Sequence, residues 1–260
     1  MKSTDMPYEE HMLNSRILEV PRFSYQRELK PERVRKIAAE FDEHIANEPK
    51  VSFRNGKYYV FDGQHTIAAR KYRNDGRDLP IRCKVYRGMT ESEEALLFAQ
   101  QTGVSADLGP GPKIRAEIYG GDPEAVAFLK TTESAGISLD YNQSRGKARI
   151  GCIATALEAY RKVGKEKYKE ALEIIMKAWD GHSDSMRAET ITGVTRFVDL
   201  YHKEYDPARL VKQLRKADPV VIAREGRAMC TNMPGHKKYL YQVLSIYNGS
   251  SKKYALPMKF

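Results

Sequence analysis

The stretch "VFDGQHTIAARK", residues 60–71, carries the end of an apolar strand through a polar turn into a helical run. Gly63 allows a sharp turn and the close approach of another group to the backbone. The amides of Gln64, His65 and Thr66 follow in the first helical turn, where they have no intrahelical acceptor and the helix dipole favours an anion. Two interpretations fit these residues: a plain turn in which His65 only caps, or a site that holds phosphate.

The segments around this turn alternate between helix and strand patterns. Residues 31–45 have apolar side chains at helical spacing and predict a helix. Asn55-Gly56 lies between two β-prone runs and predicts a hairpin. Residues 79–88 alternate apolar and polar side chains as a half-buried strand does, and a capping-box pattern predicts a helix over 90–101.

The composition changes after "NQSRGK", residues 142–147, and we expect an α+β protein in which a small mixed α/β domain is followed by an all-helical domain. Gly- and Pro-rich residues before that point predict a loop with a brief helix around 113–119. No strand is expected from about residue 147 onward. The expected parts are a tail over 1–13, the mixed domain over 14–120, a connector over 121–146 and the helical domain over 147–260. The expected helices of the last part are 147–162, 166–179, 185–203, 207–217, 219–228 and 236–247.

Composition narrows the class of protein. The 260 residues are 41% hydrophobic and 30% charged, which is typical of a soluble globular chain. No apolar run approaches the roughly 20 residues of a membrane span, and the N-terminus has no export signal. Cys83, Cys152 and Cys230 lack C-x-x-C spacing, so reduced thiols in a cytoplasmic protein with no membrane partner are expected. The sequence contains no P-loop, Gly-x-Ser-x-Gly or His-Glu-x-x-His motif of the common hydrolases.

Positive charge is concentrated in the second half. The net charge is +10, and residues 1–104 hold 18 Lys and Arg against 16 Asp and Glu, so that +8 remains for 105–260. This asymmetry favours a polyanionic partner, with DNA as the leading candidate. Lysines contact phosphates and nearby tyrosines can stack on bases; the alternative is a solvated basic surface with tyrosines packed inward. The candidate DNA-binding residues are Arg209, Lys212, Arg215, Lys216, Lys237, Lys238, Lys252 and Lys253, with Tyr239, Tyr241, Tyr247 and Tyr254 between or near them.

The order of helix, hairpin, "DGQHT" turn, helix, strand and capped helix resembles the ParB/sulfiredoxin superfamily of nucleotide-binding domains. The resemblance covers about residues 14–120 and is carried by "YQRELKPERVRKIAAEF", "YYVFDGQHTIAARK" and "ESEEALLFAQQTG". It implies that the turn cradles the phosphates of a nucleoside triphosphate, ATP or CTP, with Mg²⁺. It also implies that Arg27 points toward the nucleotide, and that a looser second stretch with Gln101, Thr102, Lys113 and Arg115 approaches the phosphates.

The residues themselves suggest roles within such a site. Asp62, beside a phosphate site, is a candidate Mg²⁺ ligand or catalytic base. Side chains of the turn can donate hydrogen bonds to phosphate, and basic residues one helical turn on supply charge. The candidate nucleotide-binding residues are Arg27, Gly63, Gln64, His65, Thr66, Arg70, Lys71, Lys113 and Arg115.

Two departures from the family pattern alter these expectations. Sulfiredoxins have a cysteine nucleophile in this turn, and Gln64 stands in its place here, so sulfinic acid reduction is not expected. Many relatives have an arginine after the histidine, whereas this chain has Thr66. Tight triphosphate binding would then depend on Arg70 or Lys71 as substitutes.

Three functions remain in competition. The first is a ParB-like protein that binds a triphosphate with Mg²⁺ and couples it to DNA, with slow hydrolysis. The second is a small-molecule kinase of the same superfamily, in which Asp62 is the base and the helical half a lid. The third is a DNA-binding protein whose nucleotide site is degenerate, with Thr66 as the sign. The sequence does not fix the oligomeric state, and a homodimer is one candidate.

Overall fold

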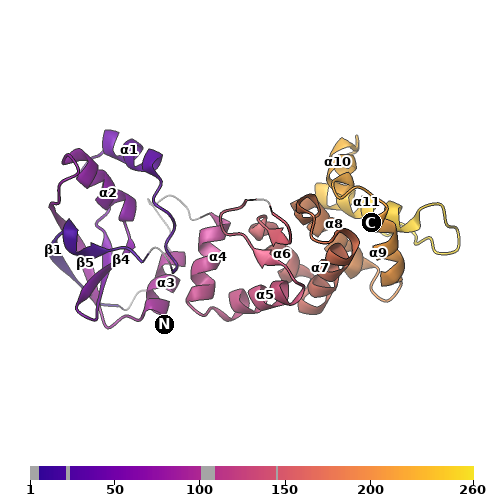
Figure 1. The fold of residues 1–260 in the computed structure, drawn as a ribbon, viewed down its shortest axis with the longest axis horizontal. Coiled ribbons are helices and arrows are strands. Elements are labelled where there is room, and N and C mark those ends of the chain that lie inside the picture. The colour runs from indigo at the N-terminus through magenta and orange to yellow at the C-terminus, as the bar shows by residue number, and fades with distance from the viewer. Residues whose placement is uncertain (1–5, 22–23, 101–108, 145) are drawn as a thin grey trace. The chain divides into compact units, whose positions relative to one another are not determined.

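The computed structural model describes residues 6–21, 24–100, 109–144 and 146–260. The chain divides into two compact units, Met1–Pro123 and Glu124–Phe260 (Figure 1). The described residues form a five-stranded sheet with helices in the first unit and a helical second unit, so the expected α+β class is confirmed. None of the helices in the described residues is long and apolar enough to cross a membrane.

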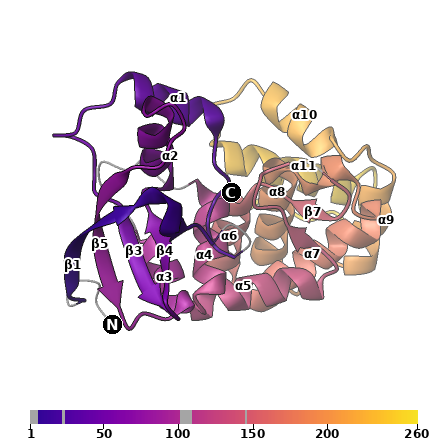
Figure 2. The same cartoon turned by 60° about the vertical axis from the view of Figure 1, so that its left-hand side comes forward.

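The first unit is built on a mixed sheet, whose strands lie side by side in Figure 2. The Asn55-Gly56 hairpin is confirmed, because both residues have positive φ, 51° and 74°, as a tight hairpin turn requires. The apolar faces of the strands form a continuous core that includes Val51, Val60 and Ile81. In sheet order the strands are β1 (Tyr8–Asn14), β5 (Pro80–Arg87), β3 (Lys50–Arg54), β4 (Lys57–Asp62) and β2 (Leu18–Glu19).

The expected N-terminal tail over 1–13 is wrong from Tyr8 onward, because this segment is the edge strand β1. It pairs antiparallel with β5 in a regular ladder from Tyr8 opposite Tyr86 to Asn14 opposite Pro80. Only one side chain of the strand, Leu13, is buried. The alternation that identifies a half-buried strand is therefore weak here, and backbone pairing with β5 defines the strand instead.

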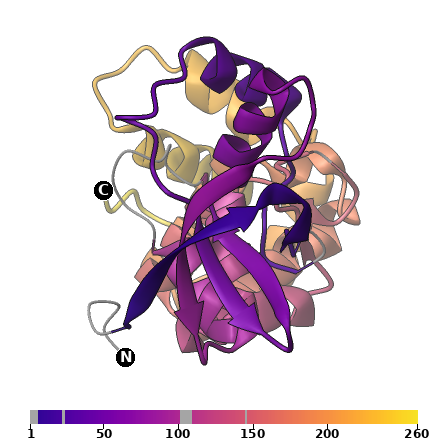
Figure 3. The same ribbon diagram turned by 90° about the vertical axis from the view of Figure 1, so that its left-hand side faces the viewer.

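The helices of the first unit lie close to the ranges that the sequence predicts. The helix expected over 31–45 ends at Ala39, and Ile45 is 69% exposed. Asp42 competes with the helix, because its carboxylate accepts a hydrogen bond from the amide of His44 at 2.8 Å. Helices α1 and α2 pack together beyond one end of the strands (Figure 3). The four helices are α1 (Pro31–Ala39), α2 (Gln64–Arg73), α3 (Glu91–Ala99) and α4 (Pro110–Tyr119).

The segment expected as a connector, 121–146, contains a helix and a short strand. Helix α5, Pro123–Ser134, buries Ala125 and Phe128 at helical spacing, but Gly120 and Gly121 just before it mask the pattern in the sequence. Ser138–Leu139 (β6) pairs in parallel with Arg149–Ile150 (β7), so the expectation of no strand after residue 147 is also wrong. Because these residues pair as strands, the next helix begins at Ile153 and not at residue 147 as expected.

The helices of the second unit surround α8. It packs against α6, α7, α10 and α11, and it buries Val194, Phe197 and Val198 at three- and four-residue intervals. Asp206 caps α9, since its carboxylate accepts from the amides of Ala208 and Arg209. The helices are α6 (Ile153–Val163), α7 (Lys165–Trp179), α8 (Ala188–Leu200), α9 (Pro207–Arg215), α10 (Val221–Ala228) and α11 (Gly235–Asn248).

Candidate functional site

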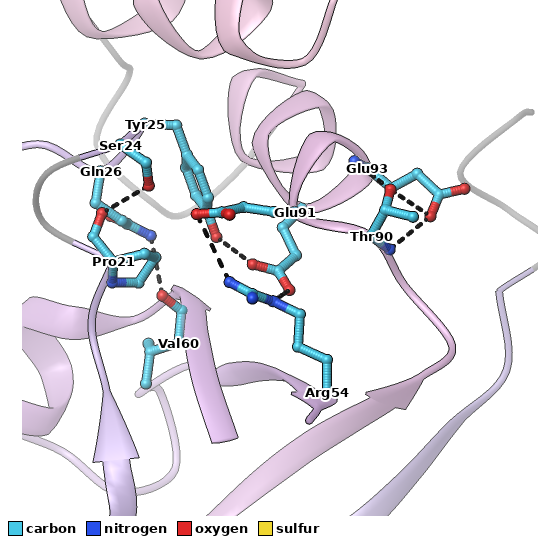
Figure 4. A network of polar contacts seen from close by, with 10 residues as sticks. Pro21, Ser24, Tyr25, Gln26, Arg54, Val60, Thr90, Glu91 and Glu93 are labelled. Atoms are coloured by element: carbon cyan, nitrogen blue, oxygen red, sulfur yellow. Dashed lines mark hydrogen bonds and ion pairs between the residues drawn. The ribbon is translucent and has the colours of Figure 1, made fainter. Parts of the chain in front are cut away.

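Buried polar contacts fix the segment that precedes α1. Tyr25 is fully buried, and its hydroxyl donates to the Glu94 carboxylate of α3 at 2.9 Å. Arg54 at the end of β3 donates to the other oxygen of Glu94 at 2.8 Å, and it also approaches Glu91 (Figure 4). Burial first, and then the charge of Glu94, raise the pKa of Tyr25 far above its usual range. Tyr25 is thus a neutral hydrogen-bond donor at any physiological pH.

Two glutamines tie the next residues to the end of β4 and the start of α2. The Gln26 amide donates to the carbonyl oxygens of Val60 at 3.1 Å and Phe61 at 2.8 Å. The Gln64 amide donates to Gln26 Oε1 at 3.3 Å and to the carbonyl of Arg27 at 2.8 Å. Gln64 is 6% exposed, so its side chain holds the backbone of Arg27. Its backbone amide remains the part that can meet a ligand.

Gly63 permits the turn from strand to helix. Its φ of 92° lies in the left-handed region, and a Cβ atom there would sit 3.0 Å from the Cα of Pro49. Helix α2 begins directly after it without a side-chain cap, and the first intrahelical bond runs from the amide of Ile67 to the Gly63 carbonyl. The three amides before Ile67 therefore have no intrahelical acceptor. This end of α2 has the geometry that the sequence predicts for an anion site.

His65 lies in the first turn of α2 and is 4% exposed. Its Nε2 accepts a hydrogen bond from the amide of Lys30, at the start of α1, at 3.2 Å. Burial, with help from Arg27, Arg33 and Lys30, lowers the pKa of His65 to about 4. The ring is then neutral at pH 7 and has its proton on Nδ1. His65 caps a backbone amide, as the plain-turn interpretation has it, and it retains one donor.

A pocket of about 510 Å³ lies in front of the first turn of α2, within the usual size range of small-molecule sites. Its lining comes from the segment before α1, from α1, from the loop between α1 and β3, and from the "DGQHT" turn. Cations, carboxylates and apolar side chains all contribute. The cationic residues are Arg27, Arg33 and Lys36, the acidic residues Glu40, Asp42, Glu48 and Asp62, and the large apolar residues Ile37, Phe41, Ile45 and Phe98.

Arg27 lines this pocket and has an unsatisfied donor. Its Nε is buried and has no hydrogen-bond partner among the described residues. Burial lowers the pKa of Arg27, and the neighbouring Arg33 lowers it further, while Asp62 opposes both. A buried donor without a partner costs about 1–3 kcal/mol, so an anionic ligand that accepted its hydrogen bond would be favoured.

Asp62, the candidate base and Mg²⁺ ligand, lies at the pocket and is already paired. Its carboxylate is 3.3 Å from the ammonium of Lys50, and its side chain is 14% exposed. The two residues face each other where the register between β3 and β4 shifts. No group of three or more His, Cys, Asp or Glu side chains suited to a metal ion occurs among the described residues. A Mg²⁺ ion would therefore need ligands from a bound phosphate as well as Asp62.

Other candidates from the sequence do not line this pocket. Arg70 forms an ion pair with Glu43 at 2.7 Å and lies 5.3 Å from the centre of the Phe41 ring. Lys71 forms an ion pair with Asp78 at 2.7 Å. Neither Arg70 nor Lys71 is among the lining residues described, although the Phe41 ring beside Arg70 is.

The part of the second stretch that lies on α4 is not brought to the pocket either. Lys113 is exposed on α4, Arg115 is partly buried on the same helix, and neither is among the lining residues described. Gln101 and Thr102 lie outside the described residues. Sequence reasoning instead missed Arg33 and Lys36. Their three-residue spacing puts them on one face of α1, and this was the signal that could have indicated them.

The candidate DNA-binding residues of the second unit differ in exposure and bonding. Arg209 donates to the carbonyls of Tyr247 and Asn248 at 3.2 and 3.0 Å, so it caps the end of α11. Tyr247 is 2% exposed, and its hydroxyl accepts from the amide of Asp206, which excludes it as a stacking platform in this fold.

The remaining basic candidates are more accessible. Arg215 and Lys238 donate to the backbone carbonyls of Lys177 and Met229, while the Lys253 ammonium lies 5.3 Å from the Tyr254 ring centre. These contacts leave the three side chains less free than the exposed lysines. Lys212, Lys216 and Lys252 are exposed, and Lys237 is half-buried.

Fold and site together define an α+β protein with an arginine-flanked pocket at a helix N-terminus. A family model described as "Family of unknown function (DUF6551)" matches residues 20–260. The chain belongs to this family. No curated protein matches the sequence.

Proposed function

We propose that this protein binds a nucleoside triphosphate, ATP or CTP, with Mg²⁺ in the α2 pocket and couples that binding to DNA in the cytoplasm. The observation that carries the proposal is the side chain of Arg27, which lines a pocket that also meets the uncapped start of α2 and has a buried Nε without a hydrogen-bond partner among the described residues. Phosphate oxygens would accept from the free amides and from Arg27, and Arg33 would offset their charge. The resemblance to ParB-like domains points the same way.

The apolar side of the pocket suits a nucleobase. Ile37 and Phe41 line it together with Ile45, which leaves 69% of its surface exposed. A planar base laid against these side chains would remove apolar surface from water, worth roughly 25 cal/mol per Å². The lining therefore offers both cationic and apolar side chains, and a nucleotide needs both.

Mg²⁺ would supply charge neutralisation between the phosphates, and Asp62 is the lining carboxylate of the turn that would help to hold it. The chain's own contribution is positioning. Gln26 and Gln64 fix the backbone at Arg27, Gly63 brings the free amides to the pocket, and the neutral His65 ring offers Nδ1–H. Slow hydrolysis is part of the proposal as the outcome of such positioning alone.

Equilibrium titration of ATP, CTP, GTP and UTP with Mg²⁺, with and without duplex DNA, tests the proposal. Arg33→Gln should weaken triphosphate binding about tenfold, because it removes a pocket cation. Arg35→Gln is the matched control, since Arg35 is exposed on the same helix and is not among the lining residues described. Equal affinity in both variants, or no binding by the wild-type protein, would refute the nucleotide site. Binding that DNA does not affect would remove the coupling, and phosphate transfer to an added metabolite would favour a kinase.

A further inference from the structure

A second pocket, of about 310 Å³, lies within the second unit among α6, α8 and the start of α11. Its lining is polar and comes from segments far apart in the sequence. Helix α6 contributes one acidic and one basic side chain, α8 contributes hydroxyls and an arginine, and α11 contributes a histidine. The residues used below are Glu158, Lys162, Thr192, Thr195, Arg196 and His236.

Basic side chains converge on this pocket. Burial lowers the pKa of His236, and the charges of Arg196, Lys162 and Lys237 lower it further. Glu158 alone opposes them. Lys162 and Arg196 line the pocket together with His236, whereas Lys237 is not among the lining residues described. Neither Lys162 nor Arg196 has an ion-pair partner among the described residues. The pocket lining thus places two cations, Lys162 and Arg196, against the carboxylate of Glu158.

The remaining carboxylate of the lining does not cancel this charge. Glu189 forms an ion pair with Arg227, so the two together are neutral. Thr192 adds a hydroxyl group from α8, whereas the hydroxyl of Thr195, which is 1% exposed, donates to the carbonyl oxygen of Ile191 at 2.6 Å within the helix. A hydroxyl and cations around one hollow are groups that bind phosphate oxygens.

Close helix packing fixes the walls of the pocket. A Cβ atom at Gly193 would lie 2.8 Å from the carbonyl oxygen of Tyr239, so glycine allows α8 and α11 to approach. A Cβ atom at Gly226 would lie 2.5 Å from the Tyr239 ring, so that ring is seated against α10. Tyr239 itself lines the pocket. The start of α11 is therefore held in place before any ligand arrives.

We propose that the α6–α8–α11 pocket binds a phosphate group, either a phosphodiester of the DNA backbone or the phosphate of a free small molecule. Lys162 and Arg196 neutralise its charge, and the Thr192 hydroxyl and the arginine supply hydrogen bonds. The site lies in the other unit from the nucleotide pocket and does not depend on it. If its phosphate belongs to DNA, it provides the DNA contact of the proposed function.

The test uses the full-length protein with two probes, inorganic phosphate followed by the NMR signals of His236, and a fluorescent DNA duplex followed by anisotropy at several salt concentrations. Lys162→Gln and Arg196→Gln should each weaken binding of the probe about tenfold. If the probe is DNA, each should also reduce by about one the slope of log affinity against log salt concentration. Lys165→Gln is the matched control, because Lys165 is exposed on α7 and is not among the lining residues described.

Each outcome decides a separate point. If both variants lose DNA affinity, the phosphate that the pocket binds belongs to the DNA backbone. If the variants lose only the phosphate-induced shift of the His236 signals and bind DNA normally, the ligand is a small phosphate compound. The site is refuted if phosphate does not shift the His236 signals of the wild-type protein and if both variants bind DNA with the same affinity as Lys165→Gln. Lys162 is exposed, so Lys162→Gln should fold normally even if Arg196→Gln does not. Triphosphate binding by the wild-type protein and by Arg33→Gln is measured in parallel. A failure of the proposed nucleotide site is therefore distinguished from a failure of the phosphate site.

Discussion

The α2 pocket and the α6–α8–α11 pocket both gather basic side chains, but the chain fixes them by different means. In the α2 pocket, buried side-chain amides bind backbone carbonyls, and so Gln26 and Gln64 set the position of Arg27. In the other pocket, helix backbones approach at Gly193, and packing sets the position of the cations. Polar bonds specify a local geometry closely, whereas helix packing specifies where three distant segments meet. The two sites should therefore respond to different substitutions.

Glu94→Ala should have the largest effect, and only on the α2 pocket. Glu94 is fully buried and accepts from both Tyr25 and Arg54, so its loss leaves a buried hydroxyl without its partner and a mostly buried guanidinium with only the longer contact to Glu91. Removing one partner of such a pair costs about 3–5 kcal/mol. Urea unfolding should show this loss, and triphosphate binding should fall because the segment before Arg27 is released.

The neighbouring Glu91→Ala is the control for this substitution. Glu91 lies 3.6 Å from Arg54 and is partly exposed, so its ion pair should contribute less than about 1 kcal/mol. Comparable losses in both variants would show that Glu94 does not organise the segment. Phosphate binding at the α6–α8–α11 pocket should be unchanged in both.

Acid should destabilise the first unit through His65. The folded-state pKa of about 4 lies below the usual value of 6.5, so the unfolded chain binds the additional proton first as the pH falls. The contribution of His65 is fully present above pH 6.5 and is lost progressively between pH 6.5 and about 4. A shift of this size corresponds to about 3 kcal/mol at most. Urea midpoints measured across this window should fall in the wild-type protein.

His65→Gln separates this effect from general acid unfolding, because glutamine can accept from the Lys30 amide and does not titrate. The variant should have a flatter profile between pH 6.5 and 4. An unchanged slope would mean that other groups cause the acid sensitivity and that His65 is not held neutral by the fold.

The contrast between the pockets also explains what the sequence could predict. The hairpin at Asn55-Gly56, the turn at Gly63 and the start of α2 are local features, and short-range backbone preferences decide them. Arg33 at the pocket was not predicted, because it depends on how α1 packs beside α2. Arg70 was expected there from its helical spacing, but Glu43 in the loop after α1 pairs with it instead.

The α6–α8–α11 pocket was harder to predict from the sequence than the α2 pocket. Its residues belong to three helices whose existence the periodicity indicated, yet nothing in a helical pattern states which helices meet. The basic residues that stood out in the sequence were the clustered ones, such as Lys252 and Lys253. Lys162 and Arg196 are 34 positions apart and meet only in the fold. Runs of charge are visible in a sequence, whereas convergent charge requires the tertiary structure.

Gly193→Ala should lower stability and weaken ligand binding at the α6–α8–α11 pocket, as Glu94→Ala does at the α2 pocket. The loss of stability should be smaller. An added Cβ would lie 2.8 Å from the Tyr239 carbonyl oxygen, so α11 must shift. Overpacking of this kind costs about 1–3 kcal/mol, although alanine gains up to about 1 kcal/mol in helix propensity. Thermal unfolding should show the net loss, and phosphate titration should show weaker binding. A more stable variant with normal phosphate affinity would mean that the α8–α11 contact does not define the pocket.

Arg27→Gln should have the smallest effect on stability and still a clear effect on binding. The substitution removes a buried Nε that has no partner among the described residues, so the free energy of unfolding should stay within about 0.5 kcal/mol or rise. Triphosphate affinity should fall about tenfold, because a charge-assisted donor is lost from the pocket. The two measurements together distinguish a ligand-binding arginine from a structural one, since the latter would lower stability and leave affinity unchanged. Phosphate binding at the α6–α8–α11 pocket, measured in the same variant, should equal that of the wild-type protein if the two pockets act separately.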